Sequence, residues 1–224
     1  MGIQVAIDGP AGAGKSTVAK KAAQAVSFIY VDTGAMYRAM AVHLLRKGIT
    51  ADKADRIPEG CQDADISIRY ENGEQVVLLH GENVNSLIRT EEVSQMASVC
   101  SALPEVRAKL LNLQRKLAEE NDVIMDGRDI GTVILPEAQV KIFLTAGVDA
   151  RAERRYKEQK AKGIDCSYEE IRKEIEERDY RDMHRETSPL KQAEDAVLLD
   201  TSFMGPEEAA GAVVDRIRST VPAE

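Results

Sequence analysis

One short segment near the start of the chain limits the choice of fold more than any other. Residues 9–17 read Gly-Pro-Ala-Gly-Ala-Gly-Lys-Ser-Thr and fit the pattern GxxxxGK[ST] at every fixed position. An apolar run precedes the segment and a helical pattern follows it, which is the context in which this pattern holds phosphate. Glycines let the backbone curl until several N–H groups point inward, and the next helix N-terminus adds more. The segment therefore predicts a phosphate-binding loop between a strand and a helix.

The side chains of this loop have distinct expected tasks. We expect Lys15 to reach the β- and γ-phosphates, Ser16 to ligate Mg²⁺, and Thr17 to steady the α-phosphate. The sequence contains neither the NKxD base reader nor the DxxG element of GTP-binding switches, so a small-molecule or nucleotide kinase is favoured. The predicted nucleotide-binding residues are Gly9, Pro10, Ala11, Gly12, Ala13, Gly14, Lys15, Ser16 and Thr17.

Short apolar runs alternate with helical patterns along the chain, which predicts an α/β fold with a parallel sheet. Four of the five expected strands end on an aspartate, and ligands bind beyond the carboxyl ends of such strands. The expected strands are 4–8, 28–32, 123–126, 141–144 and 196–200. The expected helices are 16–26, 34–47, 104–119, 167–183 and one from about 206 to 219. The sequence therefore predicts a P-loop NTPase fold with a five-stranded parallel sheet flanked by helices.

Two stretches interrupt this alternation. Residues 66–70 alternate with period two, and Asn72-Gly73 separates them from the second strand-like run 75–80, which is a strong hairpin signal. We therefore expect a small antiparallel insert at about 60–86. Residues 149–163 are dense in charge and poor in large apolar side chains, which fits either a solvated helix or a mobile lid.

Charge and cysteine content exclude several classes of protein. The chain has 224 residues, 30 Lys and Arg against 38 Asp and Glu, and a net charge of −8, which argues against general binding to nucleic-acid polymers or anionic membranes. No apolar run is long enough to span a membrane. Three cysteines without a paired motif favour reduced thiols in the cytoplasm. No exposed apolar stripe stands out, so we expect a monomer.

A kinase for an anionic acceptor needs a second anion site that faces the first. Thr33 and Arg38, at the start of an expected helix, offer a hydroxyl and a cation for a phosphate, although an ordinary helix cap would look the same. After another core strand, Asp126 is placed to hold Mg²⁺ through water and Arg128 to bridge two phosphates. Asp129 would orient Arg128 or accept a hydrogen bond from the acceptor. An ordinary turn with an exposed ion pair is the alternative.

A third cluster lies on the helix expected at 167–183. One face of this helix begins with apolar residues and then continues as Arg178, Asp182 and Arg185. Buried charges without partners are costly, so an anionic ligand is a suitable partner for these cations. The alternative is a helix end that emerges into solvent with ion pairs between successive turns.

Taken together, these motifs resemble the bacterial cytidylate kinase family, a branch of the nucleoside monophosphate kinases. The matching stretches, in family order, are DGPAGAGKST (8–17), DTGAMYRA (32–39), IRTEEVSQMAS (88–98), PEVR (104–107), DGRDIGTV (126–133), KIFL (141–144) and ERDYRDMHR (177–185). The resemblance implies one kinase domain over residues 1–224, with a nucleoside-monophosphate-binding insert at 60–90 and a helical lid at 150–166. It also implies transfer of the γ-phosphoryl group of ATP to CMP or dCMP with Mg²⁺, a step of pyrimidine metabolism.

The same resemblance implies roles for individual residues. Lys15, Arg128, Arg154 from the lid and Arg178 resemble the catalytic cations. The implied acceptor-binding residues are Thr33, Arg38, Ser98, Arg107, Arg128, Asp129, Arg178, Asp182 and Arg185. Among them Ser98, Arg107, Asp129 and Arg185 resemble the set that faces cytosine, and Asp182 resembles the contact to the sugar hydroxyls. Ser16 and Asp126 are the expected metal ligands. Alternatives that stay open are a kinase for UMP, AMP or a metabolite, and a nucleotide sensor without catalysis.

Overall fold

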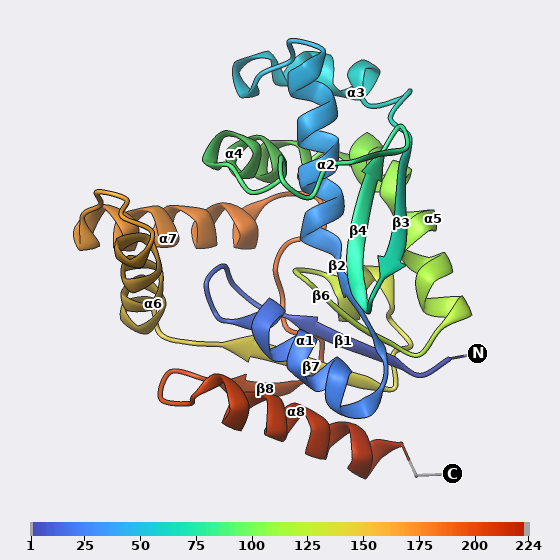
Figure 1. Cartoon of the computed structure of the whole chain (residues 1–224), viewed down its shortest axis with the longest axis vertical. Coiled ribbons are helices and arrows are strands. Elements are labelled where there is room, and N and C mark those ends of the chain that lie inside the picture. Colours follow the sequence, from blue (N-terminus) through green and yellow to red (C-terminus); the bar gives the residue numbers. More distant parts are fainter. Residues whose placement is uncertain (1, 222–224) are drawn as a thin grey trace.

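The computed structural model describes residues 2–221, and its centre is a five-stranded parallel sheet with helices on both faces (Figure 1). The strands are β1 (Gln4–Asp8), β2 (Ile29–Asp32), β6 (Val123–Gly127), β7 (Val140–Thr145) and β8 (Val197–Asp200). They follow the order β2-β6-β1-β7-β8, and each neighbouring pair is parallel. The predicted fold class is confirmed, and no predicted strand end moves by more than one residue. The phosphate loop follows the central strand.

Successive side chains of each strand point to opposite faces of the sheet, so the core forms two layers. The helices that cover the sheet are α1 (Lys15–Val26), α2 (Thr33–Arg46), α5 (Pro104–Glu120) and α8 (Pro206–Thr220). On β1, Val5 and Ile7 pack against α1 and α8, whereas Ala6 faces α2 and α5. A parallel strand that is buried on both faces has to be apolar throughout, which explains the uninterrupted apolar run before the loop.

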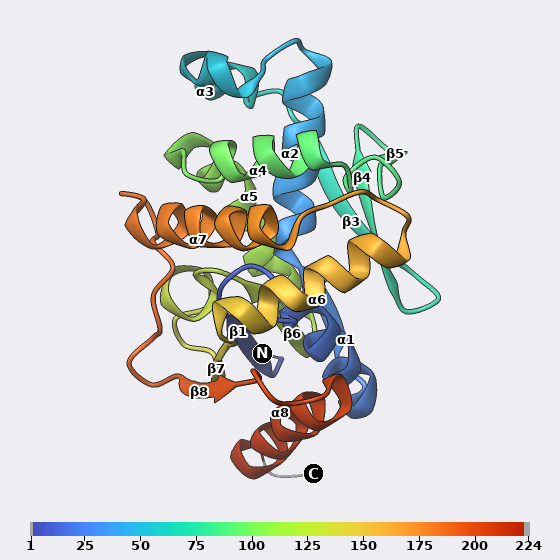
Figure 2. The same ribbon diagram turned by 90° about the vertical axis from the view of Figure 1, so that its left-hand side faces the viewer.

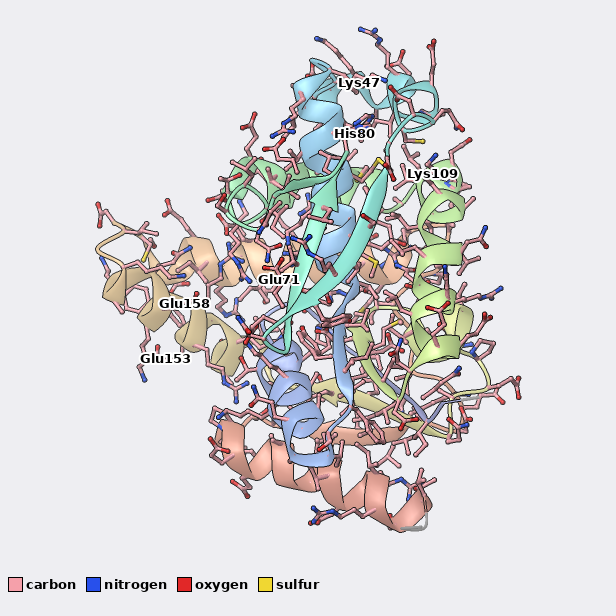
Figure 3. The ribbon with its side chains drawn as sticks, turned by 45° about the vertical axis from the view of Figure 1, so that its right-hand side comes forward. Lys47, Glu71, His80, Lys109, Glu153 and Glu158 are labelled. Carbon is pink, nitrogen blue, oxygen red and sulfur yellow. The ribbon has the colours of Figure 1, made fainter. Side chains whose placement is uncertain are left out.

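The predicted antiparallel insert is confirmed as a small second sheet. Its strands are β3 (Ile66–Glu71), β4 (Glu74–Leu79) and β5 (Glu82–Asn83). Asn72 and Gly73 have φ angles of 53° and 78°, as the tight hairpin turn requires. Val77 and Leu79 are buried in the same core as α2, so the insert is packed onto the body of the protein. Figure 3 shows the hairpin running beside α2, with Glu71 near its turn and His80 at its other end.

Two short elements before the insert and one helix after it were not predicted as helices. They are η1 (Ala51–Arg56), α3 (Ile57–Gly60) and α4 (Glu91–Cys100). The Thr90 side chain caps α4 by accepting a hydrogen bond from Val93 N at 3.3 Å. Helix α4 packs against α2, and its Val93, Met96 and Ala97 side chains are buried in the core that α2 shares.

The charged stretch at 149–163 forms α6 (Val148–Ala161), which packs against α7 (Tyr168–His184). The pair extends from the body of the protein, and α4, α7 and α6 lie one above the other (Figures 1 and 2). A small apolar cluster with Ala152, Ile171 and Ile175 at its centre joins the two helices, together with ion pairs such as Arg172–Asp149. Among residues 2–221, no helix combines the length and the apolar character needed to cross a bilayer.

Candidate active site

A cavity of about 530 Å³ opens at the carboxyl edge of the parallel sheet. Its walls are the phosphate loop, the start of α2, α4, the segment after β6, the two helices α6 and α7, and the start of α8. The cavity brings together every site residue predicted from the sequence except Gly9 and Pro10. Residues that lie far apart in the chain therefore face a common space.

The phosphate loop has the backbone that its glycines predict. A side chain on Gly9 would place its Cβ only 1.9 Å from the Leu144 carbonyl oxygen, and Gly14, which precedes α1, has a φ of 91°. Lys15 Nζ donates to the Pro10 carbonyl oxygen at 2.7 Å, which folds the side chain across the loop. Burial, with the positive charge of Arg128 nearby, lowers the pKa of Lys15 to about 7. An anionic ligand would favour the charged amine here.

Ser16 and Asp126, the two predicted metal ligands, are hydrogen-bonded to each other. Ser16 Oγ donates to Asp126 Oδ2 at 2.9 Å, and Tyr30 Oη donates to Asp126 Oδ1 at 3.0 Å. Burial and the nearby charge of Asp32 raise the pKa of Asp126 to about 6. A buried carboxylate beside a hydroxyl supplies the oxygen ligands that Mg²⁺ prefers, and the cation would offset the cost of burying the charge. The residues present therefore fit Mg²⁺.

Asp8 holds the segment that follows β6. Its two carboxylate oxygens accept hydrogen bonds from the backbone N–H groups of Ile130 and Gly131 at 2.7 and 2.8 Å. These residues begin the short helical turn η2 (Ile130–Ile134), so Asp8 fixes where Arg128 and Asp129 leave the strand. Burial raises the pKa of Asp8 to about 6, although both backbone hydrogen bonds oppose the rise.

The far end of the cavity holds a buried carboxylate between two arginines. Arg107 of α5 forms a salt bridge with Asp129, and Arg185 Nη2 lies 3.8 Å from the other oxygen of that carboxylate. Arg107 also lies over the Tyr37 ring, 5.7 Å from its centroid. Among the described residues, Arg185 Nη2 has no hydrogen-bond partner. Ser98 of α4 lines the same end of the cavity.

Between the phosphate loop and that far end, α7 contributes a second set of charges. Arg128 Nε donates to Asp182 Oδ2 at 2.9 Å. Burial and the charge of Arg128 lower the pKa of Arg178 to about 10, and Arg178 Nε has no hydrogen-bond partner in residues 2–221. Burial acts to raise the pKa of Asp182, but Arg128 and Arg178 hold it below its ordinary value. The polar end of the α7 face thus turns into the cavity.

The start of α2 adds a hydroxyl and a cation to the same space. Thr33 Oγ1 donates to the Asp126 carbonyl oxygen at 2.8 Å and is buried. Arg38 Nη2 pairs with Asp32 Oδ2 at 2.8 Å and is partly exposed to the cavity. Asp32 also caps α2 by accepting a hydrogen bond from Ala35 N at 2.9 Å, so Asp32 and not Thr33 is the cap of this helix.

Arg154 lies at a different place from the other predicted cations. Its Nη2 donates to the Thr201 carbonyl oxygen at 2.5 Å, and its Nη1 reaches the Ala13 carbonyl oxygen at 3.4 Å. Thr201 follows β8, so Arg154 lines the cavity on the side of α8. The structure thus does not bring Arg154 to the group formed by Arg128, Asp182 and Arg178.

Sequence reasoning missed a neighbouring arginine that is buried. Arg151 Nη1 donates to the Ala11 carbonyl oxygen at 3.0 Å, and Arg151 Nη2 pairs with Asp179 at 2.7 Å. One guanidinium therefore joins the phosphate loop to α7. Its position inside a charge-rich stretch gave no signal, because neighbouring arginines look alike in the sequence. The sequence placed Asp8 at the carboxyl edge of the sheet without giving it a role, and Tyr30 was missed because it reads as a strand residue.

Comparison with known proteins assigns the chain to a family. A model of the family described as cytidylate kinase matches residues 5–219. The chain is 50% identical over 222 residues to the cytidylate kinase of Caldanaerobacter subterraneus subsp. tengcongensis, covering 99% of this chain and 97% of that relative. The chain belongs to the cytidylate kinase family. A second member, the cytidylate kinase of Streptococcus pneumoniae serotype 19F, is 50% identical over 218 residues, covering 97% of this chain and 96% of the relative.

A solved structure with much lower sequence identity to the chain shares the fold. The structure of an uncharacterized protein from Eubacterium ventriosum is 15% identical, with a TM-score of 0.50 and coverage of 98% of this chain and 99% of that one. At this identity the likeness concerns the fold alone. The resemblance to cytidylate kinases drawn from the sequence motifs is confirmed by the family match over nearly the whole chain.

Proposed function

We propose that this member of the cytidylate kinase family transfers the γ-phosphoryl group of ATP to CMP or dCMP, giving ADP and CDP or dCDP. One observation carries the proposal. A single cavity has a phosphate loop at one end and the buried Arg107–Asp129–Arg185 group at the other, with Arg128 and Arg178 between them. A donor nucleotide and an acceptor nucleotide would meet phosphate to phosphate at these central arginines.

Transfer between two phosphates needs alignment and charge stabilisation more than proton removal, because the acceptor phosphate is already an anionic nucleophile. Lys15 would contact the phosphates of the donor, and Arg128 would bridge the donor and acceptor phosphates. Arg178 would stabilise the charge that develops on that group, which its buried and unpartnered Nε supports. No general base is required, and the six arginines and Lys15 that line the cavity offer positive charge for stabilisation of the transferring group.

The acceptor would lie between the start of α2 and the group around Asp129. Thr33 and Arg38 would contact its phosphate. Arg185, Arg107, Asp129 and Ser98 would face the cytosine ring, where donors and a carboxylate acceptor match its polar edge. Asp182 would accept hydrogen bonds from the sugar. The buried carboxylate of Asp129, flanked by donors, supports recognition of a base that offers both donors and acceptors.

Mg²⁺ would be held by Ser16 and by Asp126, directly or through water. When bound, the ion would neutralise charge on the phosphates and orient them. Among residues 2–221 no group of three or more His, Cys, Asp or Glu side chains could hold a metal. That finding agrees with Mg²⁺ held by one or two protein oxygens together with substrate phosphates.

Two segments would close over the substrates and exclude water, which otherwise competes as the acceptor. We propose residues 150–166 as the lid and 60–90 as the insert that supports the acceptor, within one kinase domain over residues 1–224. Arg154 would take part in transfer only after leaving Thr201 and Ala13, so its role depends on movement of α6. The apolar cluster of α6 and α7 is separate from the two clusters that cover the sheet, which supports movement of these helices as a pair.

We further propose that the protein acts in the cytoplasm, as a monomer, on small nucleotides rather than nucleic-acid polymers, in pyrimidine metabolism. Its three cysteines carry free thiols, which fits a reducing compartment. Its net charge of −8 disfavours a phosphate polymer as partner.

The test is ADP release with MgATP and a panel of nucleoside monophosphates. CMP and dCMP are expected to stimulate release, and UMP and AMP to do so much less. Equal or greater stimulation by UMP or AMP would indicate a different acceptor. ADP release that no acceptor stimulates would indicate a nucleotide sensor.

A further inference from the structure

The outer edge of β2 is paired by side chains instead of by another strand. Strand β2 is the last strand on its side of the parallel sheet, and its inner edge pairs with β6. The β3–β4 hairpin lies against the other edge. Tyr70 Oη donates to the Tyr30 carbonyl oxygen at 3.0 Å. The Gln75 side chain forms hydrogen bonds with the backbone of Asp32, two residues further along β2. The small sheet thus docks onto β2 through hydrogen bonds made by side chains.

Gln75 pairs with Asp32 as a neighbouring strand residue would. Gln75 Oε1 accepts from Asp32 N at 2.8 Å, and Gln75 Nε2 donates to the Asp32 carbonyl oxygen at 3.2 Å. Asn85 fixes Gln75 in turn, because Asn85 Nδ2 donates to the Gln75 carbonyl oxygen at 3.0 Å and Asn85 Oδ1 accepts from Val77 N at 3.0 Å. The Gln75 side chain therefore extends from a braced strand.

All polar groups of Asp32 are thereby occupied. Its backbone N–H and C=O bind Gln75, one carboxylate oxygen caps α2, and the other pairs with Arg38. Arg38 lines the main cavity beside Thr33. A continuous series of contacts thus runs from Asn85 through Gln75 and Asp32 to Arg38.

The docking of the hairpin does not depend on Gln75. Val77 and Leu79 of the same hairpin are buried in the core with α2, and Lys20 forms an exposed ion pair with Glu74 at the turn. Apolar burial of this kind outweighs two hydrogen bonds that water would otherwise make. The Gln75 amide therefore contributes more to the orientation of Asp32 than to the attachment of the hairpin.

We propose that Gln75 is a positioning residue for the acceptor phosphate. It ties the insert to Asp32, and through Asp32 it fixes the direction of Arg38 toward the phosphate of the acceptor. The proposal rests on the proposed function, because it assigns Arg38 to that phosphate. It also gives the insert a defined role, although no residue of β3, β4 or β5 lines the main cavity.

The test replaces Gln75 by methionine, which keeps the length of the side chain and removes the amide. Gln75→Met is expected to raise KM for CMP about tenfold, because Arg38 would no longer be held in the direction of the acceptor phosphate. KM for ATP and kcat at saturating CMP are expected to stay within about threefold of wild type, because the donor side is untouched. Glu74→Gln, which removes the ion pair with Lys20 on the same turn, is the matched control and should leave all three constants unchanged.

Other outcomes overturn the proposal in recognisable ways. An unchanged KM for CMP would show that Arg38 is oriented without Gln75. Gln75 would be shown only to attach the hairpin if kcat and the melting temperature fell while KM rose equally for both nucleotides. If the wild-type protein itself fails to respond to CMP, the proposed function fails. If wild type responds to CMP and Gln75→Met behaves like wild type, the positioning role alone fails.

Discussion

Arg128 donates a hydrogen bond from Nε to Asp182 Oδ2 at 2.9 Å, and this contact joins the segment after β6 to α7. The side chains are 20% and 8% exposed, so the pair is mostly shielded from water. Arg178 lies near enough for its charge to lower the pKa of Asp182. One carboxylate therefore stabilises two arginines that would otherwise repel each other in the middle of the cavity.

Asp182→Asn is expected to lower the free energy of unfolding by about 2 kcal/mol, because it leaves Arg128 and Arg178 without a balancing charge. Urea unfolding measures this loss. Saturating CMP should recover part of it, since the acceptor phosphate would supply a new anion. The matched control is Asp195→Asn, which removes a surface partner of Lys141. Equal unfolding free energies for Asp182→Asn and wild type would show that the two arginines do not need the negative charge of Asp182.

Arg178→Ala tests the residue proposed to stabilise the transferring group. We expect kcat to fall at least about 100-fold, because an arginine at developing phosphoryl charge acts mainly in the transition state. KM for CMP should rise far less. Steady-state kinetics separate the two constants. A change confined to KM would place Arg178 in ground-state binding of the acceptor and contradict its proposed role.

Arg107→Met tests the far end of the cavity. Loss of the buried partner of Asp129 should raise KM for CMP at least about tenfold, since a buried charge would lose its salt bridge. KM for ATP should change little. Arg115→Met is the control, because Arg115 lies on the same helix and binds the backbone oxygens of Val133 and Ile134 instead. Equal increases for both nucleotides would contradict an acceptor-specific role for Arg107.

The dependence of stability on pH should carry a contribution from Asp8. Burial raises the pKa of Asp8 from 3.8 to about 6, so between these values the folded protein holds a proton that the unfolded chain has lost. This contribution to stability is fully present below pH 3.8 and is lost as the pH rises through about 6. Between about pH 4 and 6.5, wild type should lose roughly 2–3 kcal/mol relative to Asp8→Asn. A constant difference in unfolding free energy would contradict the raised pKa.

The parts of the fold that the sequence predicted best are those fixed by local chemistry. The apolar run before the phosphate loop is short and has clear ends, so both predicted ends of β1 (Gln4–Asp8) agree with the structure. Asn72-Gly73 predicts the hairpin turn because few residue pairs adopt its φ angles. Helix α4 was missed because its segment was recognised only as a family motif. Its Thr90 cap and the apolar residues Val93, Met96 and Ala97 were nevertheless visible in the sequence.

The gathering of side chains in one cavity was predictable where chemistry and motif coincide, as at Lys15 or Asp129. Residues that act through others were not. Gln75 lies in a strand-like run and contacts Asp32, which is 43 residues away in the chain, so only the fold reveals the pairing. Arg151 and Arg154 differ by less than one helical turn, yet one is buried against Asp179 and the other reaches Thr201. Residues three apart lie on the same face of a helix, so the partner that each arginine reaches, and not its position on the helix, decides its role.

The most direct test of the central claim follows the phosphoryl group itself. ATP labelled in its γ-phosphate is incubated with the protein, Mg²⁺ and CMP, and the products are separated. The label should appear in CDP in step with ADP formation, and removal of Mg²⁺ with EDTA should abolish the transfer. Label that appears in inorganic phosphate at the same rate with and without CMP would contradict the account, because the γ-phosphoryl group would then pass to water instead of CMP.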